Sequence, residues 1–195
     1  MEKYNYLKEF IDIDAKNPIY DPLYADNWFY KISNINNLDN IEFITKIIFP
    51  NSLKEFWNEI GYGRLMRSFF QIKPLRSHTS PINYFLTPNM IAEIITDPEH
   101  AEGFILHLDH NEEMLENGFF PFFEECDSSY FLWMRPGEDK VYDGSARIIE
   151  NNFEDFIYKL YHVHPQYYLF NEEELKAKLE EEKKQLEIEK QERGL

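Results

Sequence analysis

Residues 48–63 read IFPNSLKEFWNEIGYG and contain the clearest local signal in the chain. Ser52 and Glu55 have the spacing of a capping box, in which a hydroxyl and a carboxylate bond the unpaired amides at the start of a helix. Four apolar residues then recur at the spacing that places them on one helical face: Leu53, Phe56, Trp57 and Ile60. Gly61 and Gly63 predict the end of this helix.

Further helices are predicted on both sides of this stretch. Residues 3–11 and 39–47 have helical spacing, and the second run is followed by Pro50. Thr87 before Pro88 indicates an N-cap and a first helical position. The buried side of that helix is expected to consist of Met90, Ile91, Ile94 and Ile95. Asn152 is expected to cap a helix whose inner face consists of Phe153, Phe156, Ile157 and Leu160.

Short strands are predicted between the helices. Alternating or continuous apolar runs indicate strands at residues 65–70, 82–86, 119–123, 129–134, 140–142 and 146–149. Residues 12–37 combine prolines, Asn, Asp and many aromatics, and we interpret them as a packed loop. Residues 101–116 fit either an alternating strand or a helix, and the helix is favoured.

The last stretch, from Glu172 onward, differs in character from the rest of the chain. It is rich in Glu and Lys at spacings that pair on a helix surface. Leu175, Leu179 and Leu186 form only a thin apolar stripe, which is too short for a coiled coil. A solvated helical tail is therefore expected, and removing residues 172–195 should leave the domain folded.

The composition indicates one packed domain with an appendage. The chain has 195 residues, of which 43% are hydrophobic and 17% aromatic. No apolar run approaches the roughly 20 residues that span a bilayer, and the charged N-terminus does not resemble a signal peptide. Cys126 is the only cysteine, which excludes an intramolecular disulfide and favours a reducing cytoplasm. We therefore expect a cytoplasmic protein with no membrane contact.

The net charge of −16 is concentrated in one segment. Residues 97–155 hold 16 acids and 3 bases, so this segment alone has a net charge of −13. Such a segment is either a solvated face that maintains solubility or a surface that speeds capture of a basic partner. Direct nucleic-acid binding is not expected, because phosphate contacts require clustered Lys and Arg.

Catalytic and metal-binding patterns are weak. The 7 glycines form no phosphate-binding loop and no nucleophile elbow. The pairs His107/His110 and His162/His164 lack the helical spacing of a zinc site, and we interpret His162 and His164 as surface histidines. Cys126 suits a half-buried apolar position better than a nucleophile. We therefore expect no enzyme, no metal and no cofactor; a hydrolase using His107 and Asp109 is the remaining catalytic alternative.

Three ordered stretches together resemble the SUKH superfamily, which includes bacterial immunity proteins and a fungal cell-wall-synthesis regulator. The first is residues 48–63, with an apolar residue before Pro50, a helix with a central aromatic and a glycine-containing turn. The second runs from Gly118-Phe119-Phe120-Pro121-Phe122-Phe123-Glu124 into Tyr130-Phe131-Leu132-Trp133. The third is Asn152-Phe153-Glu154-Asp155-Phe156-Ile157.

The resemblance implies an α+β fold, a mainly antiparallel sheet flanked by helices, here with a charged C-terminal helical tail. Residues 38–170 would form the SUKH-like domain, residues 1–37 a helix and aromatic loop packed on it, and residues 171–195 the tail. The usual role of the family is to bind and neutralise a polymorphic toxin, often a nuclease. Because nucleases tend to be basic, this role agrees with the charge argument.

We therefore expect an immunity protein whose acidic segment, residues 109–143, occupies the active site of a basic toxin. The alternative is a non-enzymatic regulatory scaffold of the same fold in cell-wall or stress signalling. A monomer or weak oligomer is expected. The candidate partner-binding residues are Glu112, Glu113, Glu116, Glu124, Glu125, Asp127, Glu138, Asp139 and Asp143.

Overall fold

The computed structural model describes residues 3–12, 27–33, 37–65, 83–97, 111–125 and 131–193. Within these ranges, seven strands form one sheet in which each strand pairs with the next one along the chain, always antiparallel. The strands are β1 (Asn27–Tyr30), β2 (Tyr62–Leu65), β3 (Tyr84–Phe85), β4 (Phe120–Glu124), β5 (Phe131–Met134), β6 (Val141–Tyr142) and β7 (Ile148–Glu150).

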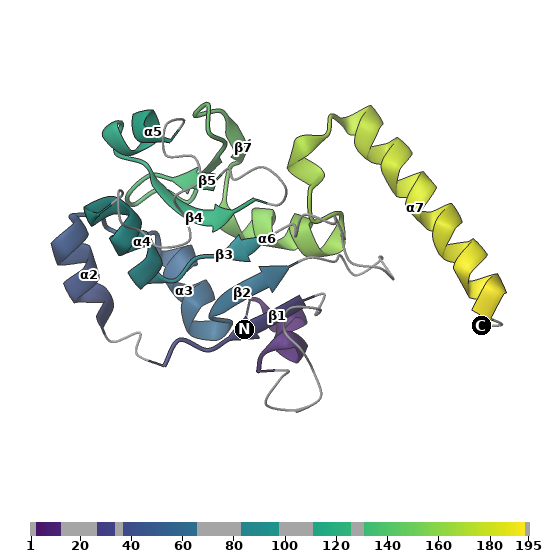
Figure 1. Cartoon of the computed structure of the whole chain (residues 1–195), viewed down its shortest axis with the longest axis horizontal. Coiled ribbons are helices and arrows are strands. Elements are labelled where there is room, and N and C mark those ends of the chain that lie inside the picture. Colours follow the sequence, from purple (N-terminus) through teal and green to yellow (C-terminus); the bar gives the residue numbers. More distant parts are fainter. Residues whose placement is uncertain are drawn as a thin grey trace.

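The described helices surround this sheet (Figure 1). They are η1 (Asn5–Phe10), α2 (Leu38–Thr45), α3 (Asn51–Glu59), α4 (Pro88–Thr96), α5 (Glu112–Glu116), α6 (Phe153–His162), η5 (Tyr167–Leu169) and α7 (Glu172–Arg193). Helices α2 and α4 contact each other at one end of the molecule, and α7 lies at the other. The expected class, an α+β fold with an antiparallel sheet, flanking helices and a charged helical tail, is confirmed.

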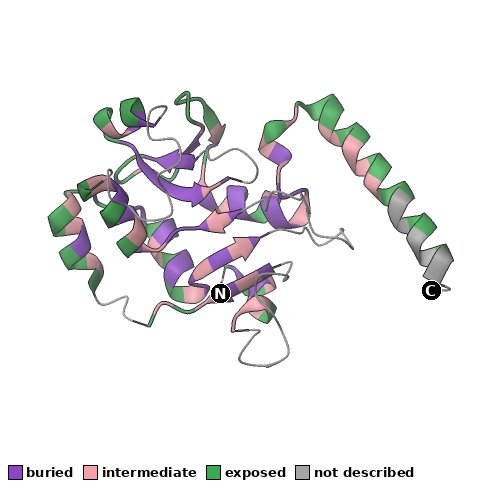
Figure 2. Cartoon of the chain, viewed as in Figure 1, coloured by how far each residue is buried: buried purple, intermediate pink, exposed green. Residues whose placement is uncertain are grey.

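The core lies between one face of the sheet and helices α3 and α6. Phe29, Phe85 and Phe123 are fully buried on this face. The Phe85 ring centroid is 4.8 Å from that of Phe56 on α3, and the Phe123 centroid is 5.6 Å from that of Phe156 on α6. Figure 2 shows the buried residues concentrated in the strands and in these two helices. Edge-to-face and tilted ring pairs therefore join the first half of the chain to the second.

The apolar face predicted for α3 is confirmed. Its four residues are at most 1% exposed: Leu53, Phe56, Trp57 and Ile60. Trp57 also donates a hydrogen bond from Nε1 to the carbonyl oxygen of Leu86, at 2.9 Å. The helix is thus positioned by one polar contact as well as by apolar packing.

Two helix caps predicted from the sequence are confirmed. The Thr87 hydroxyl accepts a hydrogen bond from the backbone N–H of Met90 at 3.1 Å, with Pro88 at the first helical position. The Asn152 side chain accepts from the backbone N–H of Asp155 at 2.7 Å. Both caps depend on residues three positions apart, so a local pattern was sufficient to find them.

The predicted capping box at Ser52 and Glu55 is wrong. Helix α3 begins at Asn51, so Ser52 lies inside the helix, and its hydroxyl donates to Asp139 Oδ1 at 2.5 Å. Glu55 accepts instead from Lys3 Nζ at 2.7 Å. Lys3 also bonds Glu154 on α6 at 2.5 Å, so the N-terminus links two helices. Partners distant in the sequence outcompeted the local motif.

The predicted loop at residues 12–37 contains strand β1, which is a correction. Residues 13–26 and 34–36 lie outside the described residues. Strand β1 pairs with β2 at very close range. A Cβ at Gly61 would lie 1.9 Å from the carbonyl oxygen of Tyr30, and a Cβ at Gly63 would lie 2.1 Å from that of Trp28. Both glycines also have positive φ, so their main role is to permit this pairing rather than only to end α3.

Other strand predictions are confirmed with shifted ends. Strands were predicted at the positions of β3, β4, β5, β6 and β7. Of the strand predicted at residues 65–70, Leu65 lies in β2, which begins earlier, at Tyr62; residues 66–70 lie outside the described residues. The helix favoured for residues 101–116 is confirmed only for α5, since residues 101–110 are not described.

Helix α7 is confirmed as a helix, but its first turns are not simply solvated. Leu175 packs against the core, and Lys178 Nζ lies 5.6 Å from the ring centroid of Phe170. His164 Nδ1 accepts from the backbone N–H of Gln166 at 3.0 Å, so Nε2 carries the proton and donates to Glu182 Oε1 at 3.1 Å. His164 is fully buried, so its interpretation as a surface histidine is wrong.

Candidate functional site: an acidic surface and pocket

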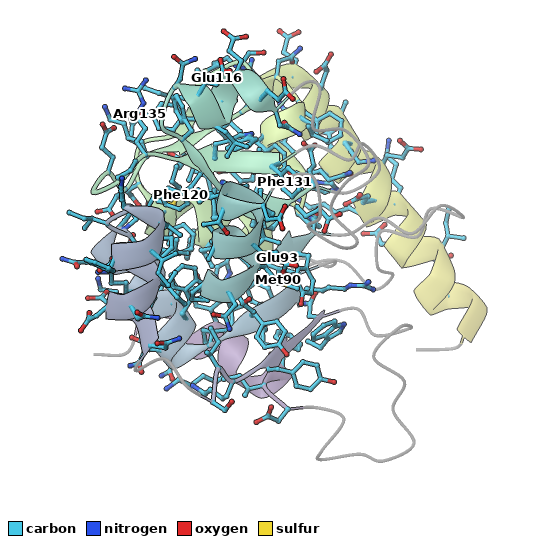
Figure 3. The ribbon with its side chains drawn as sticks, turned by 60° about the vertical axis from the view of Figure 1, so that its left-hand side comes forward. Met90, Glu93, Glu116, Phe120, Phe131 and Arg135 are labelled. Carbon is cyan, nitrogen blue, oxygen red and sulfur yellow. The ribbon has the colours of Figure 1, made fainter. Side chains whose placement is uncertain are left out.

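Helix α5 presents the most accessible of the predicted carboxylates. Glu112, Glu113 and Glu116 are exposed, and none of their side-chain carboxylates forms a hydrogen bond or ion pair with another described residue. Met114 is 3% exposed and attaches the short helix to the core. Glu116 lies on the outer side of the molecule, at the upper edge of Figure 3. These three carboxylates therefore form an unpaired negative surface.

Glu138 and Asp139 lie on the turn between β5 and β6, where both have partners within the chain. Glu138 Oε2 accepts from the Tyr142 hydroxyl at 2.9 Å, and Asp139 Oδ1 accepts from Ser52. The backbone N–H of Gly137 on the same turn donates to the carbonyl oxygen of Ile48 at 2.8 Å. Asp139 thus attaches the turn to α3 and Glu138 attaches it to β6, so only the remaining lone pairs of these two carboxylates are available to a partner.

Asp143 is the organising residue of the turn between β6 and β7. Its Oδ1 accepts from the backbone N–H groups of Ser145 at 2.9 Å and Arg147 at 3.0 Å. Its Oδ2 accepts from Arg147 Nε at 2.8 Å. The charge of Asp143 is therefore partly compensated and its position is fixed by the turn.

Glu125 follows β4 and is only 9% exposed. It forms no hydrogen bond or ion pair with any other described residue. Burial, together with the negative charge of Asp143, raises the pKa of Glu125 to about 7. A buried carboxylate without a partner is costly in its charged form, so Glu125 is poised between its two protonation states near neutral pH.

Glu125 and Asp143 line the same pocket, which has a volume of about 440 Å³. Apolar walls come from β5 and from the segment around η5, and Asn111 at the N-cap of α5 also lines it. The exposed carboxylates of α5 therefore begin directly beside the pocket. The structure thus brings together two of the predicted residues in one cavity, and the short helix that carries three more begins at its edge.

Glu124 has a different environment, although it precedes Glu125 in the chain. The register across four strands aligns Trp28, Arg64, Tyr84 and Glu124 in one row on the sheet face opposite the core. Burial raises the pKa of Glu124 to about 7, while the positive charge of Arg64 opposes the rise. Glu124 and Glu125 are therefore not part of an exposed acidic turn, which corrects the prediction of a surface cluster there.

This aromatic row was missed by the sequence analysis. Arg64 Cζ lies 5.8 Å from the Trp28 ring centroid, and Trp28 lies 6.0 Å from Tyr84. In the part of the chain that the structure describes, Arg64 Nε and Trp28 Nε1 are buried without a hydrogen-bond partner. Burial alternates along β1 and β2 but residue polarity does not, so the available signal in the sequence is the run of strand-favouring aromatics Trp28-Phe29-Tyr30.

Several sequence candidates lie outside the described residues. These are Cys126, Asp127, His107, Asp109 and His110. His162 is described and lies between aromatic rings, 4.8 Å from Tyr6 and 4.2 Å from Tyr158 by centroid distance. His164 bonds Glu182 instead, so the two histidines have separate surroundings. No group of three or more His, Cys, Asp or Glu side chains within the described ranges is arranged to hold a metal ion.

Comparison of the chain with protein-family models, with curated proteins and with solved structures found no match. Within the described ranges, no helix combines the length and the apolar character needed to cross a membrane.

Proposed function

We propose that this chain is a cytoplasmic immunity protein that binds and neutralises a basic toxin domain, such as a nuclease, through α5 and the neighbouring pocket. The observation that carries the proposal is the exposed, unpaired carboxylate cluster of α5, which lies beside the pocket that contains Glu125. Three unpaired like charges on a five-residue helix repel one another. Their arrangement is useful if a cationic surface covers them.

The packing of the core supports the resemblance on which the toxin assignment depends. The three stretches that resemble the SUKH superfamily meet in one aromatic cluster. Phe49 lies 5.3 Å from Phe120, and Phe56 lies 5.6 Å from Phe153, by ring centroids. The stretches are therefore parts of one structural unit.

A regulatory scaffold remains the second candidate because of an apolar surface away from α5. Phe43 is 82% exposed, Ile44 56% and Ile48 65%. Three large apolar side chains within six positions form a patch of the kind that proteins bury against partners. A protein with two binding surfaces suits a scaffold that connects two partners. The discriminating observation is whether the adjacent gene encodes a large secreted protein with a variable C-terminal toxin domain.

The test is reversal of the α5 charges, with Glu112, Glu113 and Glu116 all changed to Lys. The association rate with the toxin domain encoded by the adjacent gene should fall at low salt. The difference from the original protein should shrink toward 1 M salt, where the screening length is about 3 Å. The matched control reverses three exposed acids on α7: Glu172, Glu173 and Glu180.

The control changes the net charge by the same amount but should leave the association rate close to the original. Equal slowing by both triple variants would indicate a general charge effect. The proposal would be wrong if the α5 variant still protected cells from the toxin and bound the toxin at the original rate. The acidic surface of α5 would then serve solubility alone.

A further inference from the structure

We propose that the pocket beside α5 is a socket for one arginine or lysine side chain of the partner protein, with Glu125 as the acceptor of its cationic head. This inference rests on the proposed function and deepens it, because it names the residue type that anchors the partner.

The shape and lining of the pocket suit a long side chain with a charged end. A volume of about 440 Å³ lies within the range of small-ligand pockets. Phe131, Leu132 and Ile149 provide apolar walls against which an alkyl stem can pack. Leu169 at the same pocket is 49% exposed, so an apolar side chain stands at its accessible edge.

Glu125 is a buried carboxyl group of the pocket that no described residue hydrogen-bonds. More than nine-tenths of it is buried, its side chain lines the cavity, and no described residue bonds it. Asp143, by contrast, already accepts three hydrogen bonds from its own turn. An incoming cation would therefore pair with Glu125 and be attracted by Asp143 without having to break the turn.

Arg147 lines the pocket and pairs with Asp143 there. Its Nε bonds Asp143 while 73% of its side chain remains exposed. Arg147 has no bond to Glu125, so it occupies the Asp143 side of the site and leaves the buried carboxylate unoccupied. The other polar groups that line the pocket are Asn111, Ser145 and Tyr168, none of which carries a charge at neutral pH.

Binding of a cation should be coupled to the protonation of Glu125. Burial and the charge of Asp143 hold the pKa of Glu125 at about 7, so the carboxyl is about one-tenth ionised at pH 6 and about nine-tenths at pH 8. A cation binds the ionised form, so binding should release a proton and tighten about ninefold between these pH values. The other charged groups at the pocket are Asp143 and Arg147, which line it, and Glu112, which follows Asn111.

The experiment titrates the full chain with a capped peptide, Gly-Gly-Arg-Gly-Gly, and with the same peptide carrying citrulline, the neutral analogue of arginine. Binding is followed by methyl NMR signals of Leu132, Ile149 and Leu169. The arginine peptide should shift these signals and bind about tenfold more tightly than the citrulline peptide. Glu125→Gln, which keeps the shape of the protonated carboxyl, should remove this preference, whereas the control Glu93→Gln on α4 should keep it.

Equal binding of the two peptides, or an arginine preference that survives Glu125→Gln, would overturn the socket. The result is separable from that of the α5 reversal, because the peptides test the pocket without the partner. If the peptides do not discriminate but α5 reversal slows association, the socket fails and the proposed function stands. If the preference is seen but α5 reversal has no effect, the assignment to a partner side chain fails and the pocket binds a free cation.

Discussion

Glu125 and Asp143 line one pocket, and the negative charge of Asp143 adds to burial in raising the pKa of Glu125 to about 7. The two residues come from different turns of the sheet, and Asp143 is held in place by Arg147 and by backbone amides. The acidic segment therefore contains Asp143, whose charge is partly compensated by Arg147, and Glu125, whose ionisation is disfavoured by burial and by Asp143.

The first prediction concerns pH. Because the pKa of Glu125 is raised on folding, the folded state binds the proton more tightly than the unfolded state. The resulting stabilisation is fully present below about pH 4.5 and is lost as the pH rises through about 7. Glu125→Gln should therefore reduce this decline and leave the part that comes from Glu124, whose pKa is also raised to about 7 by burial. The variant should be more stable than the original protein at pH 8, by on the order of 2 kcal/mol.

Urea unfolding at pH 5, 6, 7 and 8 measures this effect. Glu93→Gln on α4 is the control, because Glu93 is exposed. The stability of this variant should depend on pH in the same way as that of the original protein. Parallel pH profiles for the original protein and Glu125→Gln would show that Glu125 is solvated. Burial lowers the pKa of His162, so His162 makes the stability rise with pH, opposite to the effect of Glu125. Because His162 is present in every variant, its contribution cancels when their profiles are compared.

The second prediction concerns the aromatic core. Trp57 and Phe156 are at most 1% exposed and contact both helices and the sheet. Changing either to Ala should lower the free energy of unfolding by about 3–5 kcal/mol. The neighbouring Tyr158 is 53% exposed, and Tyr158→Ala should cost far less. Denaturant melts that give less than about 1 kcal/mol for both core variants would contradict the packing described above.

The third prediction concerns the glycines of β2. Gly61→Ala or Gly63→Ala places a Cβ against the backbone of β1 at a positive φ, so β1 must move away. Each change should cost more than about 2 kcal/mol. Gly144→Ala is the control, since a Cβ added there would meet no described atom within 4 Å beyond its chain neighbours. Thermal unfolding checks the comparison, and equal melting temperatures for Gly61→Ala and Gly144→Ala would count against the close strand pairing.

The fourth prediction concerns α7. Removing residues 183–195 should leave the melting temperature unchanged, because the described contacts of the tail end at Glu182. Removing residues 172–195 should leave the domain folded but lower its melting temperature, since Leu175 and the His164–Glu182 hydrogen bond are lost. Calorimetry of the two truncations checks this. An identical melting temperature for both would show that the first turns of α7 contribute nothing.

Local patterns in the sequence were sufficient for the helices. The spacing of Leu53, Phe56, Trp57 and Ile60 predicted which face of α3 is buried, and Thr87 and Asn152 predicted two caps. These predictions succeed because the relevant residues lie within one helical turn or two of each other. The aromatic run Trp28-Phe29-Tyr30 could have indicated β1, but the surrounding prolines and polar residues favoured a loop.

By itself, therefore, the sequence determined the class of fold, the apolar faces of α3 and α6 and the position of the acidic segment. Tertiary structure alone decided what each carboxylate does. Glu113 is solvated and Glu125 is buried, while Asp139 bonds Ser52, a residue far away in the chain. The physical reason is that the environment of a charge depends on which other segments desolvate or bond it. The sequence of an acidic segment does not by itself show which of those long-range contacts form.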